Sequence, residues 1–94
     1  MVQNRNLMQS IADRLVPDEE AIPGVPIVEI AGDRRILVER HEGITEYCHN
    51  QIGVKIAYGI LIIYGCNLKV TKMTKQQLII FGDIDCVKIC RRSR

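Results

Sequence analysis

The strongest constraint on the fold is a run of five apolar residues, Ile60-Leu61-Ile62-Ile63-Tyr64, with no polar residue at either set of alternate positions. Successive side chains of a β-strand point to opposite faces of the sheet. A strand that is apolar at both sets of positions therefore has to be covered on both faces, by its own chain or by another one. We predict that this run is a central strand and that its neighbours, beginning with Val54, are arranged around it.

Short β-type runs separated by break signals continue through the chain from Ile27. The breaks recur about every eight to ten residues, and no long helical pattern intervenes to allow parallel crossovers. This spacing predicts a mainly β domain over residues 27–90, built as an antiparallel meander, a small barrel or a sandwich. We place the breaks at Gly32-Asp33, Glu42-Gly43, Asn50-Gln51, Gly59, Gly65-Cys66-Asn67, Thr74-Lys75-Gln76 and Gly82-Asp83.

A local repeat lies within this β region. The sequence Leu61–Gly65 (L-I-I-Y-G) recurs as Leu78–Gly82 (L-I-I-F-G), seventeen residues further on. Each copy is followed by a predicted turn and then by an apolar-Lys-apolar triplet. We interpret the copies as two similar strand–glycine–strand hairpins, since two copies are too few for a solenoid.

The two ends of the chain differ from the β region. Residues 4–16 place Leu7, Ile11 and Leu15 on one face of a short amphipathic helix. A helix of about three turns needs a docking surface, and we expect it to pack on the sheet, with binding to a membrane surface or a partner as the alternative. Residues 17–26 form a proline-rich linker, so residues 1–26 make one region. Residues 91–94 are predicted to be a basic, disordered tail.

Charge and composition do not favour nucleic-acid binding. The chain has a net charge of +2, and three positive charges lie within residues 91–94, so the rest has a net charge of −1. This is not the basic footprint of a nucleic-acid-binding domain, and the four aromatic residues are not gathered among the scattered lysines. A nucleic-acid-binding regulator is kept as the alternative function. We expect no transmembrane segment and no signal peptide, and therefore a cytoplasmic protein.

The sequence offers no catalytic or metal-binding motif that we would assign. Cys86 and Cys90 lie in a strand-like run, where they would share a face about 13 Å apart, too far to share a metal. Cys48 and His49 are adjacent, so on a strand they would point apart. We therefore predict a protein that is not an enzyme, with no cofactor and no metal, whose cysteines are small buried residues or inert surface thiols. The four cysteines are Cys48, Cys66, Cys86 and Cys90.

The repeat has more apolar surface than one small domain would bury. If one set of alternate positions fills the core of the chain, the other set forms an exposed apolar patch, which usually marks an interface. A symmetric homodimer, or a higher homo-oligomer, would bury the two matching patches together. The alternative is that the N-terminal helix or a second sheet layer covers them within one copy. The predicted interface residues are Leu61, Ile63, Ile79 and Phe81.

Taken together, the motifs from Arg35 to Ile89 resemble the YabP/YqfC family of sporulation proteins. The most specific are E-x-H-x-G, around Glu39, His41 and Gly43, and G-x-L-x-I-x-G-x-x-L-x-V, from Gly59 to Val70. The upstream helix and proline-rich linker are similar to the YqfC-like branch. The four cysteines and the basic tail depart from the family pattern.

The resemblance implies a role in endospore formation, in the mother cell, with no enzyme activity, cofactor or catalytic residue to transfer. We therefore expect a non-enzymatic protein that acts by self-association and protein–protein contacts. Its partner would be another sporulation protein, at the mother-cell side of the membrane around the forespore.

Overall fold

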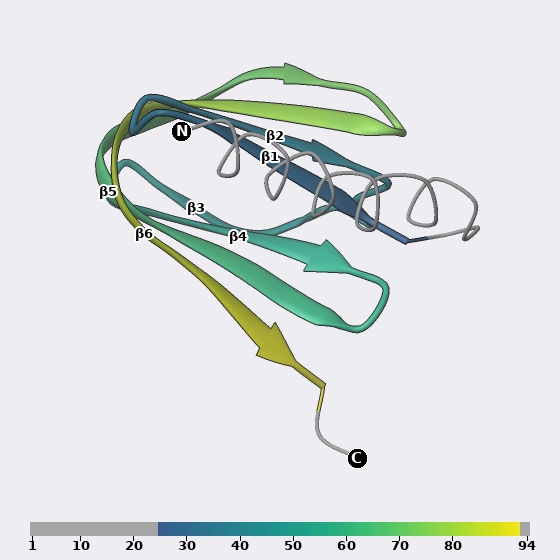
Figure 1. The fold of residues 1–94 in the computed structure, drawn as a ribbon. Coiled ribbons are helices and arrows are strands. Elements are labelled where there is room, and N and C mark those ends of the chain that lie inside the picture. Colours follow the sequence, from purple (N-terminus) through teal and green to yellow (C-terminus); the bar gives the residue numbers. More distant parts are fainter. Residues whose placement is uncertain (1–24, 93–94) are drawn as a thin grey trace, which may run out of the picture.

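The computed structural model describes residues 25–92, which form one antiparallel β-sheet (Figure 1). The predicted helix over residues 4–16 lies outside the described residues, as do most of the predicted linker and the last two residues of the predicted tail.

Six strands make up the sheet, and each pairs antiparallel with its neighbours in the order β1-β2-β6-β5-β4-β3. The prediction of a mainly β, antiparallel domain is confirmed. The strands are β1 (Ile27–Ala31), β2 (Arg35–Glu39), β3 (Ile44–Cys48), β4 (Gln51–Ile56), β5 (Gly59–Met73) and β6 (Gln77–Arg91).

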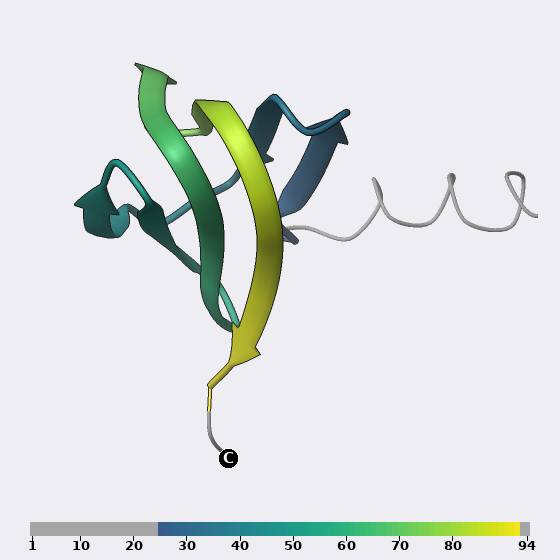
Figure 2. The ribbon, with the colours of Figure 1, turned by 90° about the vertical axis from the view of Figure 1, so that its left-hand side faces the viewer.

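The long strands β5 and β6 pair along their whole length and bend together, so that the two halves of the sheet face each other (Figure 1). Residues 59–64 of β5 pair with β4, whereas residues 77–81 of β6 pair with β2. One layer therefore contains β1, β2, the first part of β6 and the second part of β5. The other contains β3, β4, the first part of β5 and the second part of β6. Figure 2 shows β5 and β6 side by side, with one hairpin on each side of them.

The core lies between the two layers and is built from matching sets of residues. Residue pairs in register, such as Val54 with Leu61 and Val38 with Leu78, supply it from each half. Eight of its side chains are completely buried, and each layer contributes four of them. They are Ile36, Val38, Leu78 and Ile80 in one layer, and Ile52, Val54, Leu61 and Ile63 in the other.

The predicted turns at Gly65-Cys66-Asn67 and Gly82-Asp83 are wrong, because β5 and β6 run through both positions. The strands bend there, and their pairing shifts register between Tyr64 and Gly65. A β-carbon on Gly65 would collide with the carbonyl oxygen of Asp83, and one on Gly82 would lie 2.9 Å from the Cα of Leu68. The glycines therefore allow two backbones to approach closely at the bend, instead of reversing the chain.

Each bend is attached to the turn of a hairpin by two backbone hydrogen bonds. The N–H groups of Gly65 and Leu68 donate to the β3–β4 turn, at 3.1 Å from the oxygen of Asn50 and 2.7 Å from that of His49. In the other half, Gly82 and Ile84 donate to the β1–β2 turn in the same way, to Arg34 (3.1 Å) and Asp33 (2.8 Å). The L-I-I-Y/F-G repeat thus marks two halves of similar construction.

The C-terminal end of the β region is longer than predicted. Arg91 is the last residue of β6, and the backbone N–H of Arg92 donates to the carbonyl oxygen of Tyr58 at 2.8 Å. The Arg92 side chain also donates to the oxygen of Ala57 at 2.7 Å. Residues 91 and 92, which we predicted as part of a disordered tail, therefore belong to the folded domain.

Candidate interaction surface

The outer faces of the two layers carry apolar side chains from the repeat. Leu61, Ile63, Leu78 and Ile80 fill the core, so the residues directly before or after each of them in the strand point outward. We call the apolar ones the outer stripes: Ile60, Ile62 and Tyr64 on β5, and Ile79 and Phe81 on β6. Ile60 is 37% exposed and Phe81 is 43% exposed, whereas the other three are half-buried. The core is therefore filled without the outer stripes.

The structure places the four predicted interface residues on different faces. Ile79 and Phe81 lie on the outer stripe of β6, but Leu61 and Ile63 are 0% exposed in the core. The predicted interface is therefore corrected for Leu61 and Ile63, since a partner cannot reach their side chains in this fold. The residues on β5 that lie outside are Ile60, Ile62 and Tyr64.

A signal in the sequence could have made this distinction. Strand β4 alternates clearly, with Val54 apolar and Lys55 polar. The two-residue turn after Ile56 then sets the register, which pairs Val54 with Leu61 and Lys55 with Ile60. Directly paired residues lie on the same face. Leu61 therefore follows Val54 into the core and Ile60 follows Lys55 outward.

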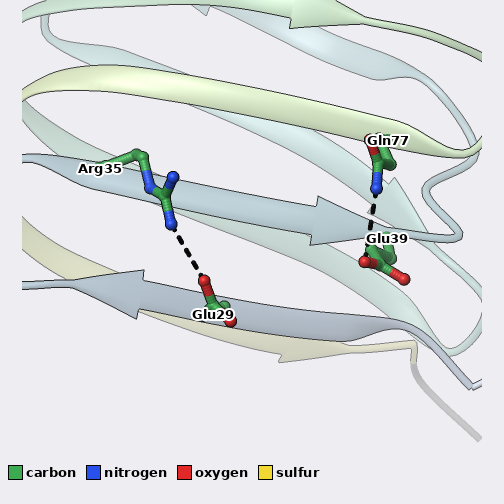
Figure 3. Close-up of polar contacts among 4 residues, drawn as sticks. All are labelled: Glu29, Arg35, Glu39 and Gln77. Atoms are coloured by element: carbon green, nitrogen blue, oxygen red, sulfur yellow. Dashed lines mark hydrogen bonds and ion pairs between the residues drawn. The ribbon is translucent and has the colours of Figure 1, made fainter.

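On the β1-β2-β6 layer, a polar contact lies near each end of the outer stripe of β6 (Figure 3). Leu37 lies opposite Ile79 in register, and Arg35 lies opposite Phe81. At one end the Arg35 guanidinium donates to Glu29 at 3.0 Å, and at the other end Gln77 donates to Glu39 at 3.5 Å. The Arg35 Nε atom is buried without a hydrogen-bond partner among the described residues. A bound carbonyl or carboxylate oxygen would satisfy it.

On the other layer, the paired neighbours of the outer stripe of β5 are a glycine, a glutamine, two cysteines and two lysines. Ile62 lies opposite Gly53 on β4, which has no side chain, and opposite Lys88 on β6. Tyr64 pairs with Cys86, and Ile60 pairs with Cys90. The outer stripe of β5 is therefore an apolar row with a lysine on each side, Lys55 on β4 and Lys88 on β6.

His41 is the one histidine that the fold buries, and it has a structural role. Its side chain is 8% exposed, and its Nδ1 accepts a hydrogen bond from the N–H of Gly43 at 3.0 Å. Its Nε2 lies 2.7 Å from the carbonyl oxygen of Thr74, so Nε2 carries the proton. The E-x-H-x-G motif thus holds the β2–β3 connection to the β5–β6 turn.

The cysteines and lysines do not form a chemical site in the described part of the chain. Three of the four thiols are exposed and Cys90 is partly buried, and all four are free. Within residues 25–92, no three His, Cys, Asp or Glu side chains meet as metal ligands, and no helix is long and apolar enough to cross a membrane. The lysines on the outer faces, such as Lys69 and Lys88, lie on different layers.

Comparison with known proteins gives one family and one curated relative. The model of the YabP family matches residues 25–93, which include all six strands that the structure describes. The chain is also 24% identical over 89 residues to the uncharacterized protein YqfC of Bacillus subtilis (strain 168), an alignment that covers 94% of this chain and 96% of the relative. No solved structure matches the chain.

Proposed function

Because this chain belongs to the YabP family, we propose that it is a non-enzymatic sporulation protein that is required for endospore formation and acts through protein contacts in the mother cell. The family match and the similarity to YqfC support the sporulation role. The contacts that we propose are self-association and the binding of another sporulation protein on the mother-cell side of the membrane around the forespore.

One observation supports the proposed mode of action. The core is completed by one set of alternate positions of the repeat, yet the opposite set is also apolar and ends in an aromatic residue in both copies, Tyr64 and Phe81. Apolar side chains that are gathered in one contiguous exposed patch usually mark a contact surface, whereas single ones do not. In an isologous pairing of two copies, an outer stripe of one copy would lie against the same stripe of its partner.

The proposed contact can be tested in solution with variants of the outer stripe. Light scattering on the wild-type protein at tens of micromolar should show a dimer or a larger species, and Phe81→Asp should shift it toward the monomer. Met73→Asp is the matched control, because Met73 is 51% exposed but lies on the core-facing side of β5, opposite Leu78. A wild-type monomer, or an equal effect of both variants, would reject self-association through the outer stripes.

The biological role needs a test in sporulating cells. Deletion of the gene should reduce the number of heat-resistant spores, and wild-type protein or Met73→Asp should restore it, whereas Phe81→Asp should not. A pull-down from sporulating cells, with Phe81→Asp as the negative bait, would then identify the partner. Normal spore numbers after deletion would contradict the requirement for sporulation, whatever the oligomeric state.

A further inference from the structure

We propose that the protein has a binding site for a small anionic amphiphile, in a hollow of about 400 Å³ near the β4–β5 turn. The ligand class is a single apolar chain that ends in a carboxylate or a phosphate. The hollow lies on the other layer from Ile79 and Phe81, and it shares Ile60 with the outer stripe of β5.

The hollow lies where three strands are in register. Lys55 on β4 pairs with Ile60 on β5, and Ile60 pairs with Cys90 on β6. One residue nearer the end of the sheet, Gly59 pairs with Arg91. In this register Lys55, Ile60 and Cys90 lie on one face of the sheet. Gly59, Arg91 and Arg92 complete this end of the lining.

The charged residues that line the hollow are all basic. Its lining includes Lys55, Arg91 and Arg92, and no acidic residue. Glu42 lies 4.0 Å from the Lys55 ammonium, but both side chains are about half exposed, so this pair is weak in water. Excess positive charge beside a concave surface attracts an anion.

The arginines are held in place without being neutralised. The Arg91 guanidinium carbon lies 5.4 Å from the centre of the Tyr58 ring, and the Arg92 guanidinium donates to the carbonyl oxygen of Ala57 at 2.7 Å. A guanidinium has five N–H donors, so each arginine keeps donors for a carboxylate or phosphate oxygen. Holding the two side chains in advance lowers the entropy that binding would cost.

The apolar residues at the base of the hollow, Ile60 and Cys90, indicate whether the ligand is a simple anion or an amphiphile. A free phosphate would leave Ile60 and Cys90 exposed to water, whereas an attached apolar chain would cover them. The volume is in the range of small-molecule sites, which are usually apolar with a few placed polar groups. Apolar residues beside basic residues therefore favour a ligand that has an apolar chain and an anionic head group.

The test uses the full chain and dissolved probes below their micelle concentrations. Decanoate and decyl phosphate should bind saturably and shift the NMR signals of residues 55, 60 and 90. Inorganic phosphate, which has the head without the chain, and decyltrimethylammonium, which has the chain with the opposite charge, should each bind at least about tenfold more weakly, ~1.4 kcal/mol. Equal binding of either control probe, or no binding of decanoate and decyl phosphate, would overturn the site.

Variants locate the binding within the fold. The double variant Lys55→Gln and Arg91→Gln should weaken decyl phosphate binding about tenfold or more. The charge-matched control is Lys69→Gln and Lys72→Gln on the other layer, and it should not change the affinity. Ile60→Trp, which fills the hollow and keeps the charges, should also abolish binding. Unchanged affinity in the first double variant or in Ile60→Trp would overturn the proposal.

Discussion

His41 donates a hydrogen bond through Nε2 to the carbonyl oxygen of Thr74, across 2.7 Å and a separation of 33 residues. This contact joins the β2–β3 connection to the tip of the β5–β6 hairpin. Thr74 in turn closes that hairpin, since its hydroxyl accepts hydrogen bonds from the N–H groups of Gln76 (3.2 Å) and Gln77 (2.9 Å). The two segments are thus joined by the His41 side chain, together with a backbone hydrogen bond of 2.7 Å from the Arg40 N–H to the Gln76 carbonyl oxygen.

Replacement of His41 should destabilise the fold. His41→Ala removes the hydrogen bonds to the Gly43 N–H and the Thr74 carbonyl, and each such bond contributes about 0.5–1.5 kcal/mol. We therefore expect the free energy of unfolding, measured in urea, to fall by about 1–3 kcal/mol for the two bonds together. His49→Ala is the control: His49 is exposed in the β3–β4 turn, and its loss should stay within about 0.5 kcal/mol. Equal effects would show that His41 is not a structural contact.

A side chain at the bend should be poorly tolerated. Gly65→Ala places a β-carbon against the carbonyl oxygen of Asp83, so the backbone of β5 or β6 has to move. Overpacking of this kind costs about 1–3 kcal/mol or more. Thermal melting should show the loss, whereas Cys66→Ala, at the exposed neighbouring position, should change stability by less than about 0.5 kcal/mol. A Gly65→Ala protein as stable as wild type would contradict the close approach of the strands.

The division of the repeat into core-facing and outer residues can be measured directly. Ile63→Ala should cost about 2–5 kcal/mol because it leaves a cavity in a completely buried site. Phe81→Ala removes a larger side chain but should cost only about 1 kcal/mol or less, because Phe81 is 43% exposed on a strand. The comparison has to be made at a concentration where both variants are monomers. A larger loss for Phe81→Ala would reverse the assignment of the faces.

The unpaired edge of β5 is protected by a tyrosine. The hydroxyl of Tyr47 accepts a hydrogen bond at 2.9 Å from the N–H of Val70, in the part of β5 that pairs only with β6 among the described strands. Tyr47→Phe should therefore lower stability by about 0.5–1.5 kcal/mol. It should also speed hydrogen exchange at the Val70 amide. Tyr58→Phe serves as the control, with no change expected at that amide.

Much of the fold could be predicted from the alternation of apolar residues and from the break signals. The hairpin turn at Gly32-Asp33 and the break at Thr74-Lys75-Gln76 are where we predicted them. The turns that we predicted at Gly65 and Gly82 are wrong, because a glycine permits a turn and a close approach of two strands equally well. What decides between these is the partner backbone, Asp83 for Gly65 and Leu68 for Gly82, which is distant in sequence.

The contact surface was harder to predict than the fold. In Ile60–Tyr64 every position is apolar, so the run itself does not show which side chains enter the core. The register with β4 supplies that information through Lys55, opposite Ile60. The hollow depends on three strands being in register at once, and the spacing of Lys55, Ile60 and Arg91 in the sequence gives no sign of it.

Because β5 and β6 belong to both layers, the two halves of the domain cannot be separated as independent folding units. The L-I-I-Y/F-G repeat suggests two modules, yet each long strand leaves one half at the bend and completes the other. Neither half retains all its strands if the chain is cut between them, so the domain should be indivisible and should melt in a single cooperative step.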